Sequence, residues 1–229
     1  MKILRLVGRF FVQIVAISAP SLAAMILAAL VAQAGSAPLK IFILSGQSNM
    51  VGLGLVDSET NPGTVEYTVA HDTDNTYQFA ADGAGGWASF EDVWMYYDGA
   101  SGDLTTGYAY DSSMIGPELG FGYAVGNYFG EQVLLIKAAW VGRSLAVDFR
   151  PPSSGGTTGS YYAGILTEVS SVIANLSTYF PDYDPAEGYE LAGFCWHQGW
   201  SDHSVEAYAA QYETNMVNFI RDIRNDLGS

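Results

Sequence analysis

Side chains able to carry out chemistry gather in three short polar blocks of this 229-residue chain. The first block is Gly46-Gln47-Ser48-Asn49, the second is Val141-Gly142-Arg143-Ser144, and the third runs from Trp196 to His203. A serine flanked by a glycine and two amides is well placed as a nucleophile if a base removes its proton. Backbone N–H groups and an amide such as Gln198 can stabilise an oxyanion. These residue types suit acyl transfer through a serine.

Each block also has a structural interpretation. Ser48 can cap a helix after a strand-to-helix turn. Arg143 can bind a substrate oxygen or pair with a surface acid, and Trp200 can stack on a sugar ring or line a surface groove. In the third block, Asp202 is a candidate helix cap. Taken alone, the first two blocks fit the structural roles better than a catalytic one.

The elements that must position these blocks alternate between strands and helices. Short apolar runs at 40–44, 132–138 and 191–196 predict buried strands, and each run ends just before one block. Helical spacing of apolar residues predicts three helices. Their ranges are 117–130, with Leu119, Tyr123 and Tyr128 on one face, 162–180 and 204–227. The segment 57–113 is expected to form surface loops with a few short strands, such as 92–97.

This alternation predicts an α/β fold with a parallel sheet that is covered on both faces. In such folds, ligands bind at the carboxyl ends of the strands. The three polar blocks lie at those ends, so we expect them to meet at one edge of the sheet.

The composition excludes several functions. The chain carries a formal net charge of −15, whereas nucleic-acid binding needs a basic surface. Cys195 is the single cysteine of the sequence, so neither an internal disulfide nor a cysteine zinc cluster can form. The sequence has three histidines, His71, His197 and His203, and this small number argues against a multi-histidine metal centre.

Residues 1–37 have the pattern of a secretion leader. Lys2, Arg5 and Arg9 precede an apolar run at 10–31, and small residues follow it. The run also reaches the length of a membrane span, so an uncleaved anchor is the alternative to a cleaved signal peptide. Either way we expect residues 38–229 to form an exported domain, periplasmic or extracellular. Removing residues 1–37 takes away three basic and no acidic residues, which leaves a net charge of −18.

Together, the three blocks resemble the SGNH hydrolase superfamily, in particular its sialate O-acetylesterase-like and carbohydrate acetylesterase branch. That branch carries a G-Q-S-N block, a G-G-K/R-S block and a Q-G-x-x-D block, and the similarity extends from about residue 40 to the end of the sequence. The resemblance implies a flavodoxin-like three-layer α/β/α sandwich. It also implies that Ser48 is the nucleophile, and that the N–H groups of Ser48 and Gly142 and the side chain of Gln198 hold the oxyanion. We assign substrate binding to Gln47, Asn49, Arg143 and Trp200.

The sequence departs from the family pattern at two places. Val141 stands where the second block has its first glycine. The family takes its catalytic histidine from an Asp-x-x-His block near the C-terminus, and this sequence has no such block. We therefore expect the domain to lack its last strand and helix, either because the sequence is incomplete or because the chain is a degenerate member. A third possibility is another base, with His203 as the fallback, although the adjacent Asp202 is poorly placed to orient it.

The resulting functional prediction is a serine esterase that removes O-acetyl groups from carbohydrates, either polysaccharides or sialic acids, through an acetyl-serine. This chemistry requires no metal or organic cofactor. The expected partner is an acetylated carbohydrate, not nucleic acid, and a membrane only if the leader stays uncleaved. The main alternative is a catalytically impaired carbohydrate-binding domain. A calcium-dependent structural domain is a weaker alternative, because the Asp- and Gly-rich loops lack EF-hand spacing.

Overall fold

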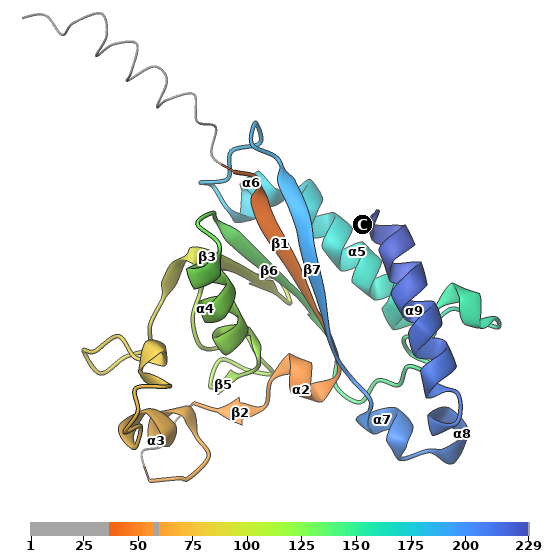
Figure 1. The fold of residues 1–229 in the computed structure, drawn as a ribbon, viewed down its shortest axis with the longest axis horizontal. Helices are drawn as coiled ribbons and strands as arrows, with labels where there is room; N and C mark the ends of the chain where they lie inside the picture. Colours follow the sequence, from red (N-terminus) through yellow and green to blue (C-terminus); the bar gives the residue numbers. More distant parts are fainter. Residues whose placement is uncertain (1–36, 57–59, 229) are drawn as a thin grey trace, which may run out of the picture. The chain divides into compact units, whose positions relative to one another are not determined.

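A central β-sheet with helices on both faces carries the three polar blocks (Figure 1). The computed structural model describes residues 37–56 and 60–228. Five strands form the sheet in the spatial order β4-β3-β6-β1-β7. Their bounds are Leu39–Gly46 for β1, Phe90–Tyr97 for β3, Ala100–Leu104 for β4, Val133–Ala139 for β6 and Tyr189–His197 for β7. The expected α/β sandwich is confirmed, but the sheet is mixed, because β4 pairs antiparallel with β3 while the other strands run parallel.

The predicted strands are present; β1 and β7 are longer than their apolar runs, and β6 is shifted by one residue. β1 and β6 occupy the middle of the sheet, and every residue of β6 is buried. Such strands are mainly apolar because helices cover both of their faces. β7 differs, because β1 is its single neighbouring strand in the described part of the chain and the residues at 191–196 are half-buried. The prediction of a buried strand was therefore wrong for β7, which lies at the edge of the sheet.

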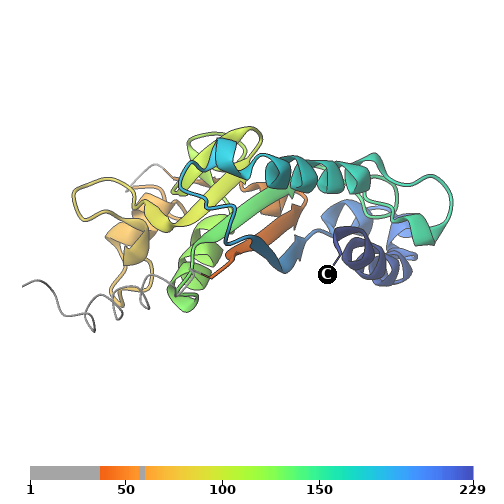
Figure 2. The ribbon, with the colours of Figure 1, turned by 90° about the horizontal axis from the view of Figure 1, so that it is seen from above.

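Helices cover the two faces of the sheet (Figure 2). On one face lie α5 (Ser160–Ala174) and α9 (Tyr212–Leu227), and on the other lie α2 (Ser48–Val51) and α4 (Glu118–Tyr128). The pleat of β3 shows how the layers divide. Trp94 and Tyr96 belong to the core on the side of α5, where their rings contact Phe180 and Tyr179, whereas Val93 and Met95 belong to the core on the side of α4. Each face of the sheet therefore has its own hydrophobic core.

The helix α4 confirms the prediction that a helix opens at Pro117, but it buries a different face. Tyr123 and Tyr128 are exposed, and the buried positions include Gly122 and Gly126 besides Leu119. A Cβ on Gly122 would lie 2.2 Å from a methyl group of Leu104. The two glycines bring the helix backbone onto the sheet, so its contact face cannot be found by counting large apolar residues.

The helix predicted at 204–227 is two helices in the structure, α8 (Glu206–Ala209) and α9. A further short helix, α7 (Trp200–His203), precedes them. The stop at Gly228 is confirmed, since this residue adopts the left-handed conformation after α9. Gln211, not Asp202, is the residue that precedes α9, so the proposed capping role of Asp202 was wrong.

The segment expected to form mainly surface loops contains more structure than predicted. It includes β3 and β4 of the main sheet. It also holds α3 (Val65–Ala70) and the 3-10 helix η1 (Gln78–Ala80). A second, two-stranded sheet is formed by the strands directly before and after the segment, β2 (Gly54–Leu55) and β5 (Met114–Ile115). A second 3-10 helix, η2 (Pro152–Ser154), interrupts the predicted loop before α5, and α6 (Leu176–Tyr179) follows α5.

The leader predicted at residues 1–37 lies, apart from Ala37, outside the described residues, as does the apolar run at 10–31. Export and its two alternatives remain predictions. Within the described part of the chain, no helix combines the length and the hydropathy that a membrane span requires.

Candidate active site

The three polar blocks meet at the carboxyl edge of the sheet, as predicted. At the end of β1, Gly46 pairs with Ala139 of β6 on one side and with His197 of β7 on the other. The Trp140 N–H donates to the Gly46 carbonyl oxygen at 3.2 Å, and the Gln47 N–H donates to the His197 carbonyl oxygen at 3.0 Å. Because β1 is between β6 and β7, the loops that follow all three strands start side by side.

Gly46 allows the first and third blocks to come this close. Its φ is +150°, in the range that favours glycine. A Cβ at this position would lie 2.1 Å from the His197 carbonyl oxygen, which is well inside van der Waals contact. A side chain here would push the two strand ends apart and move the serine that follows.

Ser48 is the first residue of the four-residue helix α2, directly after Gln47. It is half-buried, and within the described residues its hydroxyl has no hydrogen-bond partner. The helix is held by its other end, because Met50 and Val51 are buried in the core under α4. Asn49, also predicted to bind substrate, is exposed beside Ser48. The hydroxyl is therefore held on a fixed backbone and left available to a ligand.

Gln47 is buried, and its side chain links the first block to the third. Its Oε1 accepts hydrogen bonds from the N–H groups of Gly199 at 3.2 Å and Ser201 at 3.1 Å. This places Trp200, whose side chain is 74% exposed, next to the first block. The structure thus gives Gln47 a definite positioning contact, while its predicted substrate contact stays a prediction.

Asp202 joins the second block to the third, and it has no solvent exposure. Its carboxylate accepts hydrogen bonds from the N–H groups of Leu145 and Ala146, each at 2.8 Å, and from Gln198 Nε2 at 2.6 Å. This role differs from the two predicted for Asp202, which were a helix cap and the partner of a histidine. The missed clue was the acid of the Q-G-x-x-D block itself, four residues after Gln198.

Gln198 sits between the other two blocks with its amide orientation defined. Its Nε2 donates to the Arg143 carbonyl oxygen at 2.9 Å and to Asp202. Since an amide nitrogen carries two hydrogens, both donors are engaged. Its Oε1 is buried and has no partner in the described part of the chain. For Gln198 to donate to an oxyanion, as predicted, one of the two hydrogen bonds must be released.

Gly142 and Arg143 occupy the loop after β6 in different ways. Gly142 is exposed with φ +71°, and in the described structure its N–H is not engaged by another backbone group. This leaves the Gly142 N–H free for the predicted oxyanion contact. The Arg143 guanidinium lies 4.3 Å from the ring centroid of Tyr161 and 3.5 Å from an oxygen of Asp148. Arg143 is thus already held by the protein. Val141 is exposed at the same turn.

The histidines at the carboxyl edge lie next to the site without being joined to Ser48. His197, at the end of β7, and His203, in α7, are both exposed. The His203 ring lies 5.9 Å from the ring of Trp200, and the neighbouring Asp202 is committed to the backbone of the second block. In residues 37–56 and 60–228, no hydrogen bond links Ser48 to a histidine. His203 is near the site but lacks an acid that orients it.

A buried lysine lies beneath the serine helix, and the sequence analysis did not single it out. Lys137 Nζ donates to the Val51 carbonyl oxygen at 3.0 Å, at the end of α2, and to Glu118 Oε2 at 2.6 Å. It also donates to the Tyr108 carbonyl oxygen. Both charged side chains have no solvent exposure. Burial lowers the pKa of the Lys137 ammonium, and the Glu118 carboxylate opposes that shift. The clue was a lysine inside an otherwise apolar strand.

We expect Asp202→Asn to lower the free energy of unfolding by about 1–3 kcal/mol. An asparagine has one acceptor oxygen in place of two, so at least one buried N–H of Leu145, Ala146 or Gln198 loses its partner. Urea denaturation measures the effect. Asp148→Asn is the matched control in the same loop, because the Asp148 side chain is 24% exposed and water can replace the lost contact. Equal losses in the two variants would contradict the central role given to Asp202.

The described residues hold no group of three or more histidine, cysteine, aspartate or glutamate side chains arranged for a metal ion. An α/β sandwich that presents a serine after its first strand, with a glycine loop and an amide after the two neighbouring strands, is of the SGNH-hydrolase type. The profile of the family described as "Carbohydrate esterase, sialic acid-specific acetylesterase" matches residues 38–229. The chain belongs to this family, which confirms the resemblance deduced from the three blocks.

Solved structures share the fold at low sequence identity. A protein from Arabidopsis thaliana aligns over 83% of this chain and 70% of its own, with 20% identity and a TM-score of 0.52. The protein NanS aligns over 84% of this chain and 63% of its own, with 14% identity and a TM-score of 0.50. A carbohydrate acetylesterase from Xanthomonas citri aligns over 82% of this chain and 38% of its own, with 13% identity and a TM-score of 0.50. This chain therefore spans less than two thirds of the last two proteins. A comparison with curated proteins found no match.

Proposed function

We propose that the chain is a carbohydrate esterase that removes O-acetyl groups through Ser48. The observation that carries the proposal is the meeting of Ser48, Gly142 and Gln198 at one edge of the sheet in a member of a carbohydrate esterase family. Family membership favours hydrolysis over the alternative of a carbohydrate-binding domain without catalysis. An exported location, deduced from residues 1–37, is part of the same proposal.

In the proposed reaction, the Ser48 hydroxyl oxygen attacks the acetyl carbonyl carbon while a base takes the hydroxyl proton. The N–H groups of Ser48 and Gly142 stabilise the resulting oxyanion. The intermediate then collapses, the bond to the sugar oxygen breaks, and that oxygen leaves as an alcohol with the proton from the base. Water next attacks the acetyl-serine, which releases acetate and restores the hydroxyl.

The reaction needs a base near Ser48 that accepts the hydroxyl proton. Among the described residues we propose His203, because it is exposed at the carboxyl edge and follows Asp202 in the short helix α7. Without an orienting acid a histidine is a weaker base. We therefore propose low activity for this chain, well below that of an esterase with a complete triad.

The test is acetate release from acetylated xylo-oligosaccharides by the full chain, together with mass spectrometry of the acid-quenched protein. The proposal expects slow acetate release and one acetyl group on the peptide that contains Ser48. Binding of the oligosaccharides without acetate release would support the carbohydrate-binding alternative. Rapid turnover that leaves Ser48 unmodified, with the acetyl group on another residue, would contradict the proposed nucleophile.

A further inference from the structure

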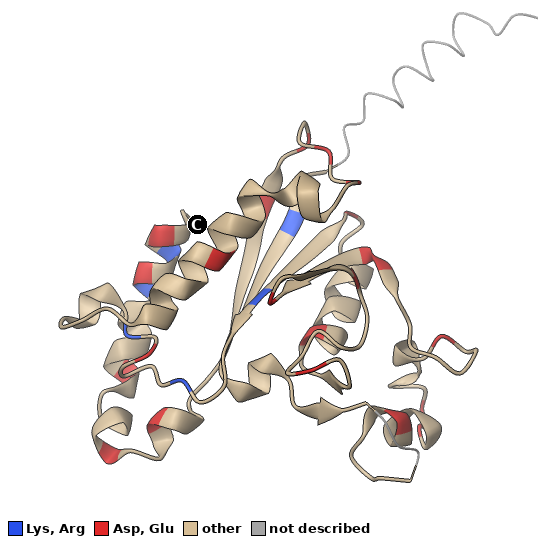
Figure 3. Ribbon diagram, turned by 180° about the vertical axis from the view of Figure 1, so that it is seen from behind, with Lys and Arg blue, Asp and Glu red and all other residues tan. Residues whose placement is uncertain are grey.

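Cations are scarce throughout the domain. From residue 38 onward the sequence has six lysines and arginines against twenty-four aspartates and glutamates. Figure 3 shows how few basic positions the ribbon carries, and that the two arginines of α9 lie toward the C-terminal end of this helix. That end lies away from the carboxyl edge of the sheet, where the three blocks meet (Figure 1). These two arginines therefore do not face a ligand bound at Ser48.

The other described cations are engaged by the protein. Lys40 pairs with Glu190 at 2.6 Å near the amino end of β1, and Lys137 is buried against Glu118. Arg150 donates to the carbonyl oxygens of Ala146, Ser154 and Gly155 and to Gln211 Oε1. The two lysines are paired with carboxylates, whereas the Arg150 guanidinium is held by neutral oxygens of the protein.

Arg143 is the remaining cation near Ser48, and its charge is already compensated. The guanidinium lies between the carboxylate of Asp148 at 3.5 Å and the face of the Tyr161 ring. Asp148 is itself held, because its Oδ2 accepts hydrogen bonds from the N–H and the hydroxyl of Ser144. The Arg143 side chain is 38% exposed, so a ligand carboxylate that reached it would compete with Asp148 for the guanidinium.

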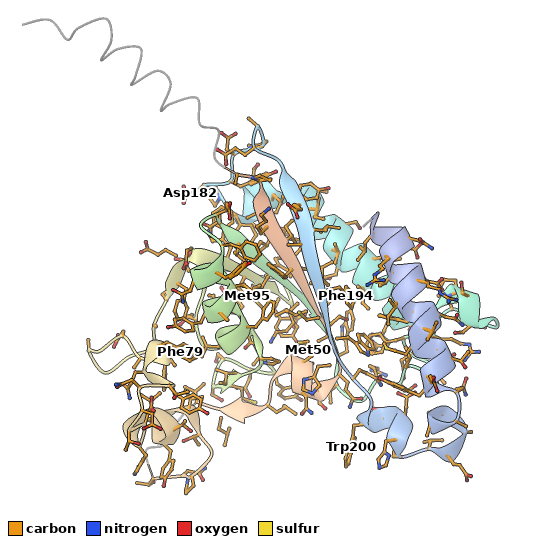
Figure 4. The ribbon with its side chains drawn as sticks, viewed as in Figure 1. Met50, Phe79, Met95, Asp182, Phe194 and Trp200 are labelled. Carbon is orange, nitrogen blue, oxygen red and sulfur yellow. The ribbon has the colours of Figure 1, made fainter. Side chains whose placement is uncertain are left out.

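An exposed aromatic side chain next to the first block suits an uncharged ring. The Trp200 side chain is 74% exposed in α7, beside the loop that Gln47 holds against the first block (Figure 4). An indole face attracts cations and apolar sugar faces, whereas its negative face disfavours an anion. Glu206, the exposed acid of the neighbouring helix α8, adds to the negative field.

We propose that this site is selective for neutral acetylated carbohydrates and disfavours those that carry a carboxylate, including acetylated sialic acids. The inference rests on the proposed function and specifies its substrate. A carboxylated ligand would enter a strongly negative field in which Arg143, the nearby cation, is already paired with Asp148, and such fields change association rates by about tenfold or more. A neutral sugar meets neither penalty and can stack on Trp200.

The test compares an O-acetylated methyl glucuronoside with its glucuronamide analogue, which differ by one charge. We expect kcat/KM to be at least about tenfold higher for the neutral amide at low ionic strength. The ratio should shrink as NaCl is raised to about 0.5 M, because salt screens the field. A similar ratio should appear in the affinities of both ligands for the Ser48→Ala variant, measured by calorimetry without turnover. Equal values for the two ligands, or higher values for the carboxylate, would overturn the inference.

Two matched variants distinguish the effect of the Arg143–Asp148 pair on selectivity from the effect of the net charge. Asp148→Asn and Glu206→Gln each remove one negative charge, but only the first removes the partner of Arg143. The quantity compared is the kcat/KM of the glucuronamide divided by that of the glucuronoside. We expect Asp148→Asn to lower this ratio at least about threefold more than Glu206→Gln, because Asp148→Asn leaves the Arg143 guanidinium available to the ligand carboxylate. Equal effects would show that the Arg143–Asp148 pair does not set the selectivity. If neither ligand is hydrolysed but the affinity ratio holds, the proposed function fails and the selectivity stands.

Discussion

Replacing Ser48 by alanine is expected to lower the hydrolysis of acetyl esters at least about tenfold, which is less than in an esterase with a complete triad because the contributions of triad members are not additive. The variant removes the atom that forms the acetyl-enzyme, so only water activated by the remaining groups can react. The half-buried Ser48 hydroxyl has no hydrogen-bond partner in the described residues, so the fold loses no contact. We therefore expect the free energy of unfolding to change by less than about 0.5 kcal/mol. Initial rates with 4-nitrophenyl acetate and urea denaturation measure the two quantities.

Ser45→Ala is the matched control for this variant. Ser45 lies three residues earlier in β1, is fully buried, and donates its hydroxyl to the Ala138 carbonyl oxygen at 2.7 Å. Its loss should cost about 1 kcal/mol of stability and leave the rate within a few fold of the unchanged chain. A Ser48→Ala variant that keeps more than a tenth of the rate would exclude Ser48 as the nucleophile.

Replacing Lys137 by methionine is expected to lower the free energy of unfolding by about 3–5 kcal/mol. The substitution leaves the Glu118 carboxylate buried without a counter-charge, and it removes the donor to the carbonyl oxygens of Val51 and Tyr108. Because Val51 ends the helix that begins with Ser48, we also expect faster amide exchange at 50–52. Urea denaturation gives the first quantity and hydrogen exchange the second.

Two further variants test whether burial of the charge causes this loss. Lys40→Met breaks an ion pair of the same 2.6 Å length, but the Glu190 side chain of that pair is 55% exposed, so the loss should stay below about 1 kcal/mol. The double variant Lys137→Met with Glu118→Gln removes both buried charges and should recover at least half of the stability. A double variant as unstable as Lys137→Met alone would argue that lost packing, not the unpaired carboxylate, causes the effect.

The sequence predicted those parts of the fold that depend on local patterns. Short apolar runs located β1, β6 and β7, and the position of the polar blocks after these strands placed Ser48, Gly142 and Gln198 at one edge. The block spacing also identified the family, because three weak motifs in a fixed order are specific together.

The remaining features depend on contacts between residues far apart in the chain. The buried face of α4 contains Gly122 and Gly126, because the absence of their side chains leaves room for side chains of β3 and β4. The hydrogen bonds of Asp202 connect residues 57 positions apart, and Lys137 meets a carbonyl group 86 positions away. Neither contact leaves a periodic trace in the sequence. The edge position of β7 likewise depends on which strands are its neighbours, which its own apolar run does not encode.

The exposed edge of β7 also has a practical consequence for handling the protein. Nine residues of this strand, rich in apolar side chains and free of lysine and proline, offer an unoccupied row of backbone groups in the described structure. Such an edge invites strand-to-strand association between molecules. The net charge of −18 from residue 38 onward opposes that association, and salt weakens the opposition. Dilute buffers of low ionic strength should therefore keep the purified protein dispersed, whereas the high salt used in many precipitation and crystallisation screens should favour aggregates.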